Sequence, residues 1–172
     1  MSARPLFWGP LTRLGLSVAA LCALADQALK LWLVYGYELG ARQPVELTPF
    51  LDLVEVWNPG ISYGLFQQQG PLGQWALFGV KLAAVLVLWV WLARVHSRLI
   101  AVSLGMIIGG AVGNAVDRLH WPGVMDFALL HIRLGGERYE WYVFNLADMV
   151  IVAGVAGLLY ESLIGERAVK AP

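Results

Sequence analysis

The sequence has few charged residues and a single cysteine. Charged side chains make up 14% of its 172 residues, whereas soluble domains contain about 25%. The 12 basic and 12 acidic residues cancel, so nucleic-acid binding is not expected. Cys22 alone excludes an internal disulfide framework and a cysteine-rich metal site. Because 59% of the residues are hydrophobic, we expect an integral membrane protein with a single domain, residues 1–172.

Two common hydrolase motifs are also missing. His96, His120 and His131 form no H-E-x-x-H pair, so a zinc protease is unsupported and no metal site is expected. The sequence contains no G-x-S-x-G elbow, and Ser103 is expected near the cytoplasmic end of a helix, far from His120 and His131. Neither a metal nor an organic cofactor is implied.

What the sequence does contain is four apolar segments. They cover residues 12–35, 73–93, 99–119 and 142–164. The length of each is close to the roughly 20 residues that a helix needs to cross a bilayer. The small residues before Asp26 resemble a signal-peptide cleavage site, but apolar residues resume after Lys30, so we expect an uncleaved first helix. Longer loops, 36–72 and 120–141, join the first span to the second and the third to the fourth.

Lysine and arginine residues predict the orientation. Six lie near the termini or in the short 94–98 link, and three lie in the longer loops (Arg4, Arg13, Arg94, Arg98, Arg167 and Lys170, against Arg42, Arg133 and Arg138). Both termini are therefore expected in the cytoplasm, with the longer loops outside. These loops contain β-prone runs, "VELTPFLDLVEVW" and two runs around "LGGE". The expected fold is mainly α, with four transmembrane helices, a small extracytoplasmic antiparallel β-sheet and an outer loop or helix.

Polar side chains recur at helical spacing in the first and third spans. Asp26 and Lys30 are i and i+4, so they can form an ion pair on one face. Asn114, Asp117 and Arg118 are expected to project to one side, where Arg118 can hold a carboxylate or a lipid phosphate. Both sets fit structural support. The alternatives are a role of Asp26 and Lys30 in orienting a substrate, and the binding of a carboxylate or lipid phosphate by Arg118.

The third span also carries small residues at a regular interval. Gly105, Gly109 and Gly113 recur every four residues on one face. This spacing allows close approach of a neighbouring helix, so we expect a packing role.

The fourth span places an amide and a carboxylate, Asn145 and Asp148, in a stretch otherwise suited to lipid. An ionisable residue inside a membrane costs at least about 2.5–3.5 kcal/mol, which makes a functional role the default hypothesis. We expect both side chains on one helix face, with Asp148 about 10 Å inside the outer boundary. Asp126 precedes Asp148 by 22 residues, and a hairpin between them would bring the two acids together.

Two carboxyl groups in contact share a proton, because both cannot ionise easily. Such a pair can activate a water as general base and protonate a leaving amine, as in an aspartic protease. Cation binding and proton relay are alternatives. A small proton-coupled transporter would use Asp26, Lys30, Asp117 and Asp148, but the polar residues cluster toward the outer half, although Lys81 is deeper. A scaffold protein would tolerate Asp→Asn substitutions.

Five motifs in one order resemble the signal peptidase II family, also called lipoprotein signal peptidase. They are "DQALK", "NPGISYGLF", "GGAVGNAVDRL", "VMDF" and "FNLADMVIVAG". The resemblance implies an aspartic endopeptidase of the bacterial inner membrane. Its substrate would be a diacylglyceryl-modified prolipoprotein, cleaved before the lipidated cysteine to remove the signal peptide.

The resemblance also implies residue roles. Asp126 and Asp148 match the catalytic pair. Further matches fall on positions that contact substrate or globomycin-type inhibitors (Asn58, Asn114, Arg118, Asn145) and on supporting polar positions (Asp26, Lys30, Asp117). Membrane lipid is an expected partner, and a monomer is the simplest state.

One motif departs from the family pattern. Ile61 stands where the family usually has alanine, and Pro59 is uncommon there, while Tyr63 keeps the aromatic residue. We expect these departures to change the loop shape, and so the fit of substrate or inhibitor, more than the acid pair.

Overall fold

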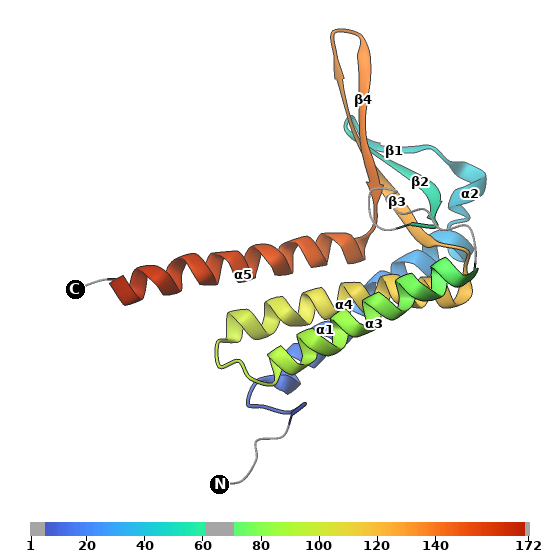
Figure 1. Cartoon of the computed structure of the whole chain (residues 1–172). Coiled ribbons are helices and arrows are strands. Elements are labelled where there is room, and N and C mark those ends of the chain that lie inside the picture. The colour runs from blue at the N-terminus through green and yellow to red at the C-terminus, as the bar shows by residue number, and fades with distance from the viewer. Residues whose placement is uncertain (1–5, 61–70, 171–172) are drawn as a thin grey trace.

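The computed structural model describes the backbone of residues 6–60 and 71–170, and the side chains of residues 6–60, 75 and 78–163. Helices and strands follow in the order α1 (Thr12–Leu31), the π-helix η1 (Trp32–Gly36), α2 (Leu39–Arg42), β1 (Val45–Thr48), β2 (Leu51–Asn58), α3 (Pro71–Leu92), α4 (Arg98–His120), β3 (Val124–Leu134), β4 (Glu137–Phe144) and α5 (Leu146–Lys170). The helices run side by side, and the sheet lies at one end of them (Figure 1). A mainly helical fold with an antiparallel sheet was therefore predicted correctly.

The helix α4 is the centre of the bundle, because α1, α3 and α5 all pack against it. Its glycines permit this contact. A Cβ atom added to Gly109 would lie 2.5 Å from the Ala19 carbonyl oxygen of α1, and one added to Gly110 would lie 2.5 Å from the Ala147 carbonyl oxygen of α5. The predicted packing role of the glycine face is thus confirmed, and α4 contacts two helices through adjacent glycines.

Three helical segments are long and apolar enough to cross a membrane: Thr12–Gly36, Arg98–His120 and Leu146–Leu163. The expected second span corresponds to α3, where the described apolar stretch is the shorter segment Phe78–Leu92. Length and composition therefore support three of the four expected spans among the residues that the structure describes.

The start of the fourth span was predicted wrongly. Residues 142–144 belong to β4, where Val143 pairs with Leu129 and Phe144 pairs with Ala128 of β3. Aromatic and β-branched residues suit a strand as well as a membrane helix, so hydrophobicity alone could not separate the two. The helix α5 begins at Leu146, and Asp148 lies in its first turn rather than about 10 Å inside it.

The sheet has the order β1-β2-β3-β4 and every pairing is antiparallel. The β3–β4 turn uses Gly135 and Gly136 at positive φ, as the "LGGE" sequence predicted. Pairing of Val56 with Asp126 and of Asn58 with Val124 brings the end of β2 beside the start of β3. A buried cluster anchors this part of the sheet to η1 and α2 (Leu33, Leu39, Met125, Phe127 and Ala128).

A buried ion cluster links three strands farther along the sheet. Asp52 on β2 is 1% exposed and accepts a hydrogen bond of 2.7 Å from the Arg138 guanidinium on β4. The His131 ring on β3 lies 3.1 Å from the other Asp52 oxygen. The hydrogen bond from Arg138, followed by that from His131, lowers the pKa of Asp52 despite its burial. The cluster therefore keeps a carboxylate ionised inside the sheet and ties its strands together.

We expect Gly109→Ala to destabilise the protein by about 1–3 kcal/mol, because the new methyl group would push α1 away from α4. Gly79→Ala on α3 is the matched control, since an added Cβ there meets nothing within 4 Å. Melting temperatures in detergent micelles would measure both effects. Equal melting temperatures for the two variants would contradict close packing at Gly109.

Candidate active site

Buried polar residues gather where the helices meet the sheet. They come from separate parts of the chain: Asp26 and Lys30 on α1, Asn114 and Asp117 on α4, Asp126 on β3, and Asn145 just before α5. Each is at most 4% exposed. Buried charges and amides are tolerated only when they are hydrogen-bonded, so their contacts define the site.

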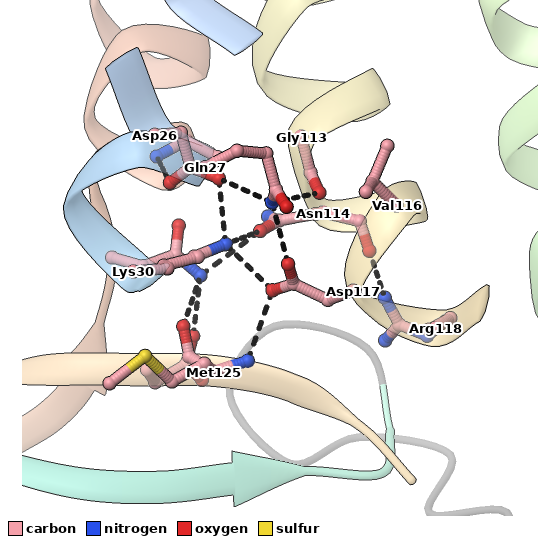
Figure 2. Close-up of polar contacts among 12 residues, drawn as sticks. Asp26, Gln27, Lys30, Gly113, Asn114, Val116, Asp117, Arg118 and Met125 are labelled. Atoms are coloured by element: carbon pink, nitrogen blue, oxygen red, sulfur yellow. Dashed lines mark hydrogen bonds and ion pairs between the residues drawn. The ribbon is translucent and has the colours of Figure 1, made fainter. Parts of the chain in front are cut away.

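The Lys30 ammonium group is at the centre of these contacts (Figure 2). It lies 2.8 Å from an Asp26 oxygen, 2.7 Å from an Asp117 oxygen and 3.0 Å from the Asn114 side-chain oxygen. Three donors therefore meet three acceptors. The predicted ion pair between Asp26 and Lys30 is present, and Asp117 of α4 joins it.

The two acids bound to Lys30 also hold the backbone. Asp26 accepts a hydrogen bond of 2.9 Å from the Ala147 amide, and Asp117 accepts one of 3.1 Å from the Met125 amide. Ala147 directly precedes Asp148, and Met125 directly precedes Asp126. The ion cluster therefore fixes the backbone beside each of the two acids expected to be catalytic.

Gln27 completes this support. Its side-chain amide donates to the other Asp117 oxygen over 2.6 Å and to the Gly113 carbonyl over 3.0 Å. No role for Gln27 was expected from the sequence. The available indication was its position directly after Asp26, in a polar group of residues inside an apolar helix.

Asn145 connects the two expected catalytic acids. Its side-chain oxygen accepts from the Asp148 amide over 3.0 Å, and its backbone amide donates to Asp148 over 3.3 Å. This reciprocal pair is a capping box at the start of α5, so the placement of Asn145 inside a helix was wrong. The Asn145 side-chain nitrogen also donates to Asp126 over 2.6 Å. One residue thus positions both carboxyl groups.

Asp126 and Asp148 both line a small cavity of about 10 Å³, which is about the space needed to hold one water molecule. Its remaining lining residues are Asn58, Lys81, Asn114, Arg118 and Val124. Asn58 donates to Asp126 over 3.2 Å, and Asn114 donates to Asp148 over 3.0 Å. Each acid therefore has an oxygen held by an asparagine on the cavity wall.

Burial, followed by the charge of Asp148, raises the pKa of Asp126 to about 6. Hydrogen bonds from Asn58 and Asn145 act in the opposite direction. A carboxyl group with this pKa keeps its proton in weakly acidic solution, where an ordinary aspartate has lost it. The site can therefore contain a proton donor beside a second acid.

Arg118 makes different contacts from those expected. Its guanidinium donates to the Asn114 carbonyl over 3.1 Å and to the Gly60 carbonyl, rather than to a carboxylate. Among the described residues it thus holds the backbone just after β2, at Gly60. Lys81 also lines the cavity. The sequence indicated its place in an apolar span but no role for it. Ile61 and Tyr63 lie outside the described residues.

Solved structures share the fold of this chain. Two solved structures, each described as a bacterial membrane enzyme, superpose with TM-scores of 0.75 and 0.72 at 21% and 20% identity. Both alignments cover 92% of this chain, and they cover 92% and 98% of the solved chains. The chain therefore has the fold of these two structures.

The family follows from the sequence. Residues 18–164 match the family model described as signal peptidase (SPase) II. A lipoprotein signal peptidase of Rhodopseudomonas palustris is 53% identical over 160 residues, covering 93% of this chain and 98% of the relative. One of Nitrobacter hamburgensis is 51% identical over 160 residues with the same coverage. The chain belongs to the signal peptidase II family and is a protease.

We expect Lys30→Met to lower the free energy of unfolding by about 3–5 kcal/mol, because it leaves the Asp26 and Asp117 carboxylates buried without a cation. Lys81→Met is the matched control, since it also removes a lysine charge from a helix facing the site. Unfolding in mixed micelles would compare the two variants. Equal stability would mean that the Lys30 cluster does not hold the bundle together.

Proposed function

We propose that this protein removes the signal peptide from diacylglyceryl-modified prolipoproteins by cleaving the peptide bond before the lipidated cysteine. Family membership and the names of the relatives support this substrate. The observation that carries the chemistry is that Asp126 and Asp148 line one small cavity while asparagines orient both carboxyl groups. In this proposal the two acids are the catalytic pair.

The environments of the two acids suggest different roles. Asp126 carries the proton, because burial and the neighbouring acid favour its neutral form. Asp148 lies in the first turn of α5, where the helix dipole favours a negative charge. Asp148 then acts as the general base and Asp126 as the general acid.

The reaction follows from this assignment. Asp148 takes a proton from a water in the cavity, and the water oxygen forms a bond to the carbonyl carbon before the lipidated cysteine. Asp126 donates its proton to the carbonyl oxygen as negative charge develops there. When the C–N bond breaks, Asp126 takes this proton back as the carbonyl re-forms. The proton held by Asp148 passes to the cysteine nitrogen, which leaves as an amine. All steps use side chains of this protein.

We place α1, α3, α4 and α5 across the bacterial inner membrane as one multi-pass domain of residues 1–172. The sheet and the site then lie at the outer face, with both termini in the cytoplasm. The lysine and arginine distribution supports this orientation. It also suits the substrate, because diacylglycerol chains stay in the lipid while the cysteine backbone meets the site near the headgroups.

The binding residues in this proposal are Asn58, Asn114, Arg118 and Asn145, which surround the acid pair. The same groups would contact a globomycin-type inhibitor, and membrane lipid would surround the helices of a monomer. Asp26, Lys30 and Asp117 support the site through their contacts with the backbone. In the described helices, the buried polar residues away from the site are Thr12 and Ser103. This distribution gives little support to a transporter with a polar path across the membrane.

We expect Asp126→Asn and Asp148→Asn to lower kcat/KM by at least about 100-fold, because each removes a proton-transfer group. Release of the signal peptide from a diacylglyceryl-modified precursor, measured with purified protein in micelles, would check this. Glu137→Gln, at an exposed position of β4, is the control for loss of an acid away from the site. Near-parental cleavage by either aspartate variant would remove that residue from the catalytic pair.

The raised pKa of Asp126 predicts the alkaline side of the pH profile. As the pH rises through about 6, Asp126 loses the proton that the general acid needs, so kcat/KM should fall. Initial rates measured at a subsaturating precursor concentration, from weakly acidic to weakly alkaline pH, would locate the pH at which kcat/KM falls. An activity that stays constant through this range would show that the Asp126 proton is not required.

A further inference from the structure

Lys81 places a positive charge on the wall of the cavity. It lies within α3, in the otherwise apolar sequence "GVKLAAVLVLWVWL", and is half-buried. An ionisable residue in a membrane helix is costly and calls for a functional explanation. In the described part of the chain, no residue accepts a hydrogen bond from its ammonium group. The contacts of the Lys30 cluster therefore do not account for Lys81.

The other two cations of the site both donate hydrogen bonds to described residues, although the buried Nε atom of Arg118 has no partner among them. Lys30 gives its three donors to Asp26, Asp117 and Asn114. Arg118 donates to two backbone carbonyls. Lys81 is thus the lysine that lines the cavity, and it comes from α3, whereas Lys30 belongs to α1.

The charged groups around the cavity interact as one set. The charge of Lys81 interacts with the charges of Arg118, Asp148, Lys30 and Asp117. Asp126 interacts electrostatically with Asp148 and Lys30, and Asp26 does so with Lys30 and Asp117. The set contains four acids from α1, α4, β3 and α5, and three cations from α1, α3 and α4.

This composition favours one protonation state of the acid pair. With all acids ionised, the set has an excess of one negative charge, and a single proton on Asp126 or Asp148 makes it neutral. Without Lys81, the set with one proton on the acid pair would have a net charge of minus one, and a second proton on the pair would be favoured. A doubly protonated pair has no base to activate water. An ammonium group is a compact point charge, which suits this role.

We propose that Lys81 is a positioning residue whose charge holds the Asp126–Asp148 pair in the singly protonated state that hydrolysis needs. This inference rests on the proposed function, because it concerns the proton on that catalytic pair. Lys81 acts through the two acids and takes no part in bond making. It also gives α3 a part in the chemistry, in addition to its packing against α4.

The test compares Lys81→Met with the parent protein over the whole pH range of cleavage. Removing the cation favours the protonated acids, so the kcat/KM profile should move to higher pH by about 0.5–1 unit. At weakly acidic pH the variant should be less active than the parent, while on the alkaline limb its relative activity should rise. Lys81→Arg keeps the charge and should keep the parental profile.

Two further variants make the comparison specific. Arg133→Gln removes one positive charge from an exposed position of β3, away from the cavity, and should leave the profile unshifted. Lys81→Gln replaces Lys81→Met if the methionine variant does not fold. A parental profile in the uncharged variant, or an equal loss of activity at every pH without rescue by arginine, would overturn the inference. If Asp126→Asn or Asp148→Asn still cleaves, the proposed function fails instead.

Discussion

The site depends on one buried ammonium group, that of Lys30. It joins carboxylates from α1 and α4 whose remaining hydrogen bonds fix the backbone beside Asp126 and Asp148. A membrane interior makes such an arrangement stable only when every charge is compensated, because unpaired ions there are expensive. The same constraint fixes the positions of these side chains, because moving any one charged group of the cluster would leave another without a partner. The positions of the two acids are therefore set largely by the ion pairs and hydrogen bonds of this cluster.

The junction of sheet and helices adds a second constraint. Asn145 lies between β4 and α5, where its side chain caps α5 and donates to Asp126 on β3. Pairing of β2 with β3 brings Asn58 to the other side of Asp126. The sheet is consequently part of the site, and its hydrophobic cluster with η1 and α2 keeps β3 in place. Helix packing through the α4 glycines completes the frame from the membrane side.

Much of this site could be predicted from the sequence. Local spacing was enough for the Asp26–Lys30 pair and the glycine face, and the ordered motifs indicated both acids of the cavity. Hydrophobicity failed at residues 142–144, since "YVF" suits a strand and a span equally, although "NLAD" carried a usable capping signature. The contact between Asp26 and Ala147 joins residues 121 positions apart, and no local pattern specifies it. The partners of Arg118 and the place of Lys81 likewise depend on how α3 and β2 meet α4.

The Asp26–Lys30 pair also bears on how such a protein is made. Because the two residues are one helical turn apart, the first helix can enter the bilayer with its charges already neutralised by each other. Asp117 joins them when α4 arrives, and the Ala147 amide follows with the last helix. In the proposed mechanism, a nascent chain that lacks α5 has a charge-paired first helix but no second catalytic acid, because Asp148 lies in the first turn of α5. On that mechanism, such a chain would not hydrolyse its substrate until α5 has been made.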